Sequence, residues 1–271
     1  MDIWTLFIGF VLGIIEGVTE FLPVSSTGHL ILAGDLLGFN DNRAKTFEIA
    51  IQLGAILAIL WLYRDRIREN ISGLSLGRAA RDFWLNLGIA FVPAAAVGFL
   101  AHKWIKAYLF NPVTVAAALV AGGIAILVIE RLVRPGTTSE VENVTPGQAL
   151  KIGAAQCLAL FPGVSRAGAT IMGGLVFGLS RKAATEFSFF LAIPTMFAAV
   201  GYDLFKNRAF ISSADLPLFA VGFVTAFVSA LVVVRAFVGF VSRRDFTPFA
   251  VYRIVFGLLV LAYYGMRGWA F

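Results

Sequence analysis

Long runs of apolar residues, separated by short polar segments, extend along the whole chain. Six of these runs predict helices that cross a membrane, since about 17–25 apolar residues span the hydrocarbon core. They cover residues 47–63, 83–101, 113–129, 187–202, 216–234 and 249–266. The polar segments 40–45, 64–82 and 130–151, and a short segment with Lys103 and Lys106, predict loops. No soluble insert separates the runs, so we expect a single integral membrane domain over residues 1–271.

Two further apolar stretches, residues 13–38 and 153–178, are interrupted by polar breaks. Pro23 and the run Ser25-Ser26-Thr27 break the first stretch, and Pro162-Gly163 breaks the second, whose next helix is expected to start near Val164. Proline disrupts a helix interior, and serine and threonine favour helix N-termini. Each stretch therefore predicts a re-entrant helix hairpin. Irregular backbone at membrane depth is tolerated only inside protein or around a wet cavity, which makes both breaks candidate sites.

The two broken stretches resemble each other when the first is shifted by 140 positions. The shift aligns the pairs Gly13/Gly153, Phe21/Phe161, Val24/Val164, Ser25/Ser165, Gly28/Gly168, Ile31/Ile171, Gly34/Gly174 and Gly38/Gly178. Three predicted spans follow each copy, and an odd number of crossings inverts the second copy. The predicted fold is an all-α polytopic membrane protein with two inverted-topology repeats, about 1–134 and 145–271. Each repeat would be a hairpin plus three transmembrane helices, an architecture typical of transporters.

Composition agrees with a membrane protein and gives its orientation. The chain is 59% hydrophobic and 14% charged, whereas soluble domains are about 25% charged. Most Lys and Arg residues fall in the segments 64–82, 130–151, 178–183 and 241–248. The positive-inside rule places these segments in the cytoplasm, so both termini and the open end of the first hairpin lie outside. The net charge of +6 is thus a topology and lipid signal, and no nucleic-acid partner is expected.

Cysteine and histidine are too scarce for several kinds of site. The single cysteine, Cys157, excludes an intramolecular disulfide and a cysteine metal cluster. With only two histidines, His29 and His102, we expect no histidine-based zinc site.

Several polar and ionisable residues lie close together in and around the first break. Glu16 and Glu20 share one helix face, and a carboxylate at bilayer depth costs about 2.5–3.5 kcal/mol on insertion scales. Their mutual repulsion calls for a proton or a divalent cation, and we interpret the pair as ligands of a divalent cation. Ser25 is expected to cap the second helix, because Ser165 occupies the same position in the other repeat. Ser26 is then the candidate nucleophile, with His29 as the base that takes its proton.

The second break has the features of an anion-binding site. A helix N-terminus offers unpaired N–H groups and the positive end of the helix dipole. Arg166 adds a planar fork that binds two phosphate oxygens at once. The residues expected to bind phosphate are Gly163, Ser165, Arg166 and Thr170, with Ser25 and Thr27 from the first break. Together the two breaks indicate phosphate chemistry on a lipid.

The two breaks carry the segments EGVTEFLPVSSTGH and FPGVSRAGAT. These segments resemble the signature motifs of the bacterial undecaprenyl pyrophosphate phosphatases of the bacitracin-resistance type, and the resemblance covers essentially the whole chain. It implies a multi-pass inner-membrane enzyme, its active site facing the periplasm, that uses a divalent cation such as Mg²⁺ or Ca²⁺. Such an enzyme converts undecaprenyl diphosphate to undecaprenyl phosphate, which recycles the lipid carrier of peptidoglycan synthesis and confers bacitracin resistance.

The family motifs map onto seven positions, and one position departs from them. The family residues correspond to Glu16, Glu20, Ser26, His29, Ser165, Arg166 and Thr170. The second motif often ends in serine, where this chain has Ala167.

Several alternatives stay open at this point. A lipid flippase or transporter would also suit inverted repeats, but it has no need of a hydroxyl–imidazole pair. Glu48 and Glu186 are equally compatible with a site or a structural role, and Gln156 is expected to support the site or pack a helix. The nucleophile can be Ser26, His29 or a water molecule. The oligomeric state is open, with a homodimer as one alternative.

Overall fold

The structure is a computed structural model that describes all residues except 1, 76, 109–110, 135, 208–212 and 268–271. The described residues form helices and no named β-strand. The α-helices are α1 (Ile3–Thr19), α2 (Ser26–Leu36), α3 (Asn42–Leu62), α4 (Arg64–Ser72), α5 (Arg78–Tyr108), α6 (Pro112–Leu132), α7 (Pro146–Gln156), α8 (Arg166–Val176), α9 (Arg181–Asn207), α10 (Leu216–Val241) and α11 (Thr247–Met266). Short 3₁₀ turns include η2 (Val141–Asn143) and η3 (Cys157–Leu160).

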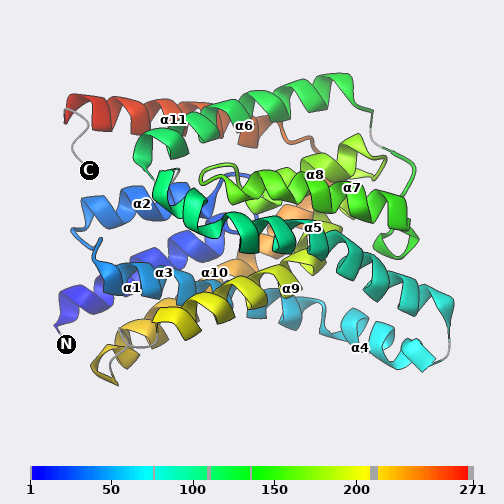
Figure 1. Cartoon of the computed structure of the whole chain (residues 1–271), viewed down its shortest axis with the longest axis horizontal. Coiled ribbons are helices and arrows are strands. Elements are labelled where there is room, and N and C mark those ends of the chain that lie inside the picture. Colours follow the sequence, from blue (N-terminus) through cyan, green and yellow to red (C-terminus); the bar gives the residue numbers. More distant parts are fainter. Residues whose placement is uncertain (1, 76, 109–110, 135, 208–212, 268–271) are drawn as a thin grey trace.

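Six described helices, α3, α5, α6, α9, α10 and α11, are long and apolar enough to cross a membrane. They contain the six predicted runs, except that α3 ends at Leu62, one residue before the predicted end, so this part of the predicted fold is confirmed. Figure 1 shows the start of α1 and the end of α11 at the same end of the bundle, with α6 and α11 side by side at one edge.

The helices extend further than the apolar pattern predicted. The predicted loop 40–45 is wrong in part, because Asp41 accepts a hydrogen bond from the Ala44 amide at 2.7 Å and α3 starts at Asn42. The predicted loop 64–82 contains α4, and α5 continues past Lys103 and Lys106. Helical hydrogen bonds are local, so a helix continues into water where its residues are good helix formers and no breaker intervenes.

Both broken stretches form pairs of short helices, α1 with α2 and α7 with α8. They begin earlier than predicted, at Ile3 and Pro146, because the preceding Asp2 and Thr145 side chains cap α1 and α7. The second helix of the second pair starts at Arg166 rather than near Val164.

The backbones of the two pairs repeat at the 140-residue offset. Ser25 and Ser165 have φ values of 71° and 74°, and in the described part of the chain they are the non-glycine residues with positive φ. Gly38 and Gly178 also have positive φ, after α2 and α8 respectively. The Phe39 amide bonds the Gly34 carbonyl at 2.8 Å, and the Leu179 amide bonds the Gly174 carbonyl at 2.9 Å. The offset seen in the residues is therefore also present in the backbone geometry.

Small residues let the hairpins approach the long helices. Along α1, Gly9, Gly13 and Gly17 face α10, where a Cβ on Gly13 would collide with the Gly222 backbone. In the second pair, Gly153 of α7 lies against the Ala90 backbone of α5. Small residues at such crossings allow the close backbone contact that packs helices in membranes.

Candidate active site

The two breaks meet through side chains from both hairpins. The Ser26 hydroxyl at the start of α2 donates to Glu20 Oε2 at 2.5 Å. The other oxygen of the same carboxylate accepts from Arg166 of α8 at 3.2 Å. The side chains of Glu20 and Arg166 retain only 10% and 11% exposure, so the pair is screened from water and electrostatically strong.

Helix α9 holds Arg166 in place. The Arg166 guanidinium donates to the Ser188 carbonyl at 2.9 Å and lies over the ring of Phe21. The Thr170 hydroxyl donates to the Arg166 carbonyl at 2.9 Å and lies 2.6 Å from the Ser188 hydroxyl. Thr170 therefore supports the arginine in this structure.

The two strained serines differ in how they cap their helices. The Ser165 hydroxyl accepts from the Gly168 amide at 3.1 Å and lies 3.5 Å from the Leu22 carbonyl of the other break. Ser25 occupies the N-cap position of α2, but its side chain makes no capping hydrogen bond in the described structure. The expectation that Ser25 caps α2 through its hydroxyl is therefore wrong.

His29 is not hydrogen-bonded to Ser26. Its Nδ1 lies 2.7 Å from the Ser25 carbonyl, and its Nε2 lies 2.6 Å from the Tyr252 hydroxyl. The ring also stacks on Phe256 with 4.2 Å between centroids. The predicted pair of Ser26 and His29 is thus replaced in this geometry by Ser26 and Glu20.

Arg253 joins the two breaks and was missed by the sequence reasoning. The side chain is 1% exposed, and it donates only to backbone carbonyls. The acceptors are Pro23 in the first break, Gly163 and Val164 in the second, and Ala118 and Leu119 of α6, at 3.0–3.3 Å. An arginine inside the predicted span 249–266 was the available signal, because a charge at that depth needs partners.

Glu16 is the buried carboxylate that could take a cation. It is completely buried, and neither of its oxygens has a hydrogen-bond partner among the described residues. No set of three Asp, Glu, His or Cys side chains in the described ranges is placed to hold a metal ion. Magnesium, however, is commonly held by one or two carboxylates together with substrate phosphates. The donor set of Glu16 and Glu20 therefore fits a cation brought together with a diphosphate.

The remaining predicted residues lie close to the breaks. Gly163 has φ 92°, and a Cβ there would collide with the Val115 backbone of α6, so packing explains this glycine. Thr27 is partly buried in the first turn of α2. Ala167 is completely buried in the apolar core. Gln156 is buried, with its Oε1 3.4 Å from the Thr195 hydroxyl.

Glu186 belongs to an ion-pair cluster separate from the two breaks. Of the two roles that the sequence left open, this placement supports the structural one. Arg66 of α4 contacts Glu186 at 2.9 Å and Glu142 of η2 at 2.6 Å. Burial would raise the pKa of Glu142, but the hydrogen bonds from Arg66 outweigh it and hold that pKa below its usual range. The cluster ties α4 and η2 to α9.

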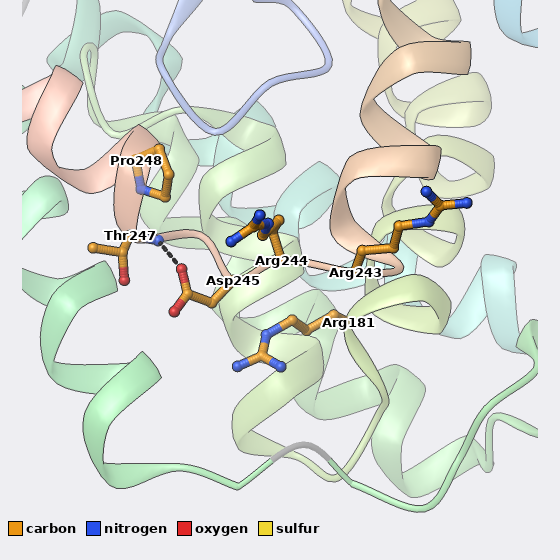
Figure 2. Close-up of a pocket in the computed structure, with 6 residues that line it drawn as sticks. All are labelled: Arg181, Arg243, Arg244, Asp245, Thr247 and Pro248. Carbon is orange, nitrogen blue, oxygen red and sulfur yellow. Dashed lines mark hydrogen bonds between the residues drawn. The ribbon is translucent and has the colours of Figure 1, made fainter.

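A pocket of about 510 Å³ lies away from the breaks, at the start of α9 and the connection between α10 and α11. Its lining residues are Arg181, Arg243, Arg244, Asp245, Thr247 and Pro248 (Figure 2). Asp245 accepts from the Thr247 amide, and Arg181 is paired with Glu130. The lining contains no buried hydroxyl beside a carboxylate, so this pocket is not the candidate catalytic site.

Comparison with known proteins identifies the family. The family model described as "Bacitracin resistance protein BacA" matches residues 9–259. The chain belongs to this family. A relative named undecaprenyl-diphosphatase from Nitrosomonas europaea is 58% identical over 272 residues, covering 100% of this chain and 99% of the relative. Proteins of the same name from Methylobacillus flagellatus and Nitrosospira multiformis are 56% and 57% identical, covering 97% and 100% of this chain and the whole of each relative.

Proposed function

We propose that this chain is an undecaprenyl-diphosphate phosphatase of the bacterial inner membrane. It hydrolyses undecaprenyl diphosphate to undecaprenyl phosphate and inorganic phosphate, which recycles the lipid carrier and confers bacitracin resistance. The relatives of 55–58% identity carry the name of this activity over nearly their whole length. The observation in the structure that supports it most is the buried contact of Ser26 with Glu20 and of Glu20 with Arg166.

The geometry supports Ser26 as nucleophile and Glu20 as its base. The Ser26 oxygen attacks the terminal phosphorus, and the bond from that phosphorus to the bridging oxygen breaks. Glu20 takes the serine proton, and undecaprenyl phosphate leaves. Water then releases phosphate from the serine, with Glu20 returning a proton. An alternative is direct attack by a water molecule that Ser26 and Glu20 orient.

Charge stabilisation comes from the second break. Arg166 and the N-termini of α2 and α8 direct donors toward the phosphoryl group, where catalysis of this step is mostly electrostatic. Glu16, with Glu20, is the place for a divalent cation such as Mg²⁺ or Ca²⁺. When bound, the cation would neutralise charge on the diphosphate oxygens. The isoprenoid tail lies against exposed apolar side chains of the long helices, which face membrane lipid.

The proposed architecture places the two hairpins as inverted, re-entrant repeats. In Figure 1, α1 and α2 open toward the end where the chain begins, and α7 and α8 open toward the opposite end. The repeated backbone features at the 140-residue offset support this arrangement. The basic segments then face the cytoplasm, and the site opens to the periplasm.

The function is tested with purified protein in detergent and undecaprenyl diphosphate. We expect release of inorganic phosphate that stops on chelation and resumes on adding Mg²⁺ or Ca²⁺, and no release by Ser26→Ala. Lipid movement across vesicles without any phosphate release would instead identify a flippase. Release that chelation leaves unchanged would remove the cation from the proposal.

A further inference from the structure

We infer that Tyr252 and His29 form a positioning pair that holds the strained backbone at Ser25, so that His29 does not serve as the base for Ser26. The inference rests on the proposed phosphatase function. It concerns how Ser26 is aimed at Glu20 rather than which reaction occurs.

Hydrogen-bond chemistry assigns the proton on His29. A carbonyl oxygen can only accept, so the 2.7 Å contact with Ser25 requires a hydrogen on His29 Nδ1. In the neutral ring, Nε2 then carries the lone pair and accepts from the Tyr252 hydroxyl at 2.6 Å. Both ring nitrogens are therefore committed, and neither can take the proton of Ser26 while these bonds persist.

Aromatic packing fixes the plane of the same ring. The planes of His29 and Phe256 differ by 10°, and those of His29 and Tyr252 by 2°. Tyr252 and Phe256 are four residues apart on α11, so one helix face supplies both partners. The histidine cannot turn toward Ser26 without losing its stacking and both hydrogen bonds.

The difference between the two breaks explains why the first needs such a pair. Ser25 and Ser165 share a positive φ, which persists only where the surroundings determine it. At the second break the Ser165 hydroxyl binds the Gly168 amide. At the first break the described structure shows no such cap, and His29 holds the Ser25 carbonyl instead. The residue at the position of His29 in the second repeat is Ala169.

Histidine NMR tests the pair directly. The chain has two histidines, so ¹⁵N-histidine labelling gives two sets of signals, and His102→Gln identifies those of His29. We expect neutral His29 to carry its hydrogen on Nδ1, and Tyr252→Phe to shift the Nε2 signal. Tyr263→Phe is the matched control. It also removes a tyrosine hydroxyl from α11, but that hydroxyl binds Asp35 rather than His29. A hydrogen on Nε2, or an unmoved Nε2 signal in Tyr252→Phe, would overturn the inference.

Kinetics separate positioning from base catalysis. Losing one hydrogen bond predicts that Tyr252→Phe lowers kcat about 2- to 10-fold with little change in KM. His29→Asn keeps an N–H near the Nδ1 position but has no base, so it should retain more turnover than His29→Ala. Equal inactivity of both variants would instead support His29 as a proton acceptor and overturn the inference.

Failure of this inference is distinguishable from failure of the proposed mechanism. An active Ser26→Ala together with a shifted Nε2 signal in Tyr252→Phe would remove the serine nucleophile and leave the pair in place. An inactive Ser26→Ala, together with an unmoved Nε2 signal and unchanged turnover in Tyr252→Phe, would keep the serine nucleophile and remove the positioning pair.

Discussion

At the residue scale, the contact between Ser26 and Glu20 makes them act as one unit. Glu20→Gln replaces the carboxylate with an amide, which can still accept a hydrogen bond but cannot take the serine proton, so phosphate release should fall nearly as far as in Ser26→Ala. The double variant should be little slower than either single variant, because residues that act together are not additive. Phosphate release measures all three, and thermal melts in detergent control for folding. Additive losses would show that Glu20 acts independently of Ser26.

Arg166 makes a second prediction at this scale. Arg166→Lys keeps the charge but cannot reach Glu20 and the Ser188 carbonyl together. Turnover should fall by about 10²–10³, as for loss of one preorganised donor. The control is Arg68→Lys, since the Arg68 side chain is 76% exposed on α4. Turnover at the wild-type level in Arg166→Lys would show that the arginine only supports the fold.

The sequence was enough to propose several of these residues as site residues, but it did not give their contacts. Ser26, Glu20 and Arg166 were predicted as site residues because polar groups at membrane depth are costly. Their pairing was not predicted, since helical spacing relates Ser26 to His29 but says nothing of Glu20 beyond the turn. Arg253 lies in an otherwise apolar run, and its carbonyl partners are distant in sequence.

At the element scale, Arg253 should decide whether the breaks hold their shape. Arg253→Met removes the donor from five backbone carbonyls, and a buried carbonyl left unsatisfied costs about 1–3 kcal/mol. Arg253→Lys can satisfy only some of them and should fall between Met and the parent. Melting temperature and phosphate release in detergent should drop together across the series. A Met variant that melts with the parent would mean that water replaces the guanidinium.

Close helix crossing gives another prediction at this scale. In Gly153→Ala, the new Cβ would lie 2.8 Å from Ala90 Cα, so α7 must move away from α5. The strain should cost about 1–3 kcal/mol of unfolding free energy. Gly88→Ala on α5 is the control, because nothing lies within 4 Å of its added Cβ; it should stabilise by about 0.5–1 kcal/mol. Equal melting temperatures would argue that the crossing is looser than described.

The elements themselves were largely predictable. Six apolar runs became six membrane-capable helices, since length and hydropathy determine membrane crossing. The ends of α3 and α5 could not be predicted from the apolar pattern. Polar residues such as those from Asn42 to Lys45 occur in helices as readily as in loops. The family resemblance carried by the two broken stretches is confirmed by the match over residues 9–259.

At the scale of the whole molecule, topology decides whether the two hairpins enter from opposite faces. Asn40 lies between α2 and α3, and Ser139 lies between α6 and α7; both are exposed. Three membrane-capable helices, α3, α5 and α6, lie between positions 40 and 139. An odd number of crossings places the two positions on opposite sides of the membrane. Inverted repeats therefore require these two positions on opposite sides of the membrane, and the positive-inside rule predicts that Ser139 lies on the cytoplasmic side.

The measurement uses single cysteines in a Cys157→Ala background and a membrane-impermeant maleimide on intact cells. Asn40→Cys should be labelled from outside, whereas Ser139→Cys and Ser242→Cys should react only after permeabilisation. Ser242 follows α10 and serves as an independent marker of the basic face. Labelling of positions 40 and 139 from the same side would exclude inverted hairpins. If the two positions were labelled from opposite sides but Ser139→Cys from outside, the hairpins would still be inverted. The basic segments would then lie outside, and the proposed site would open to the cytoplasm.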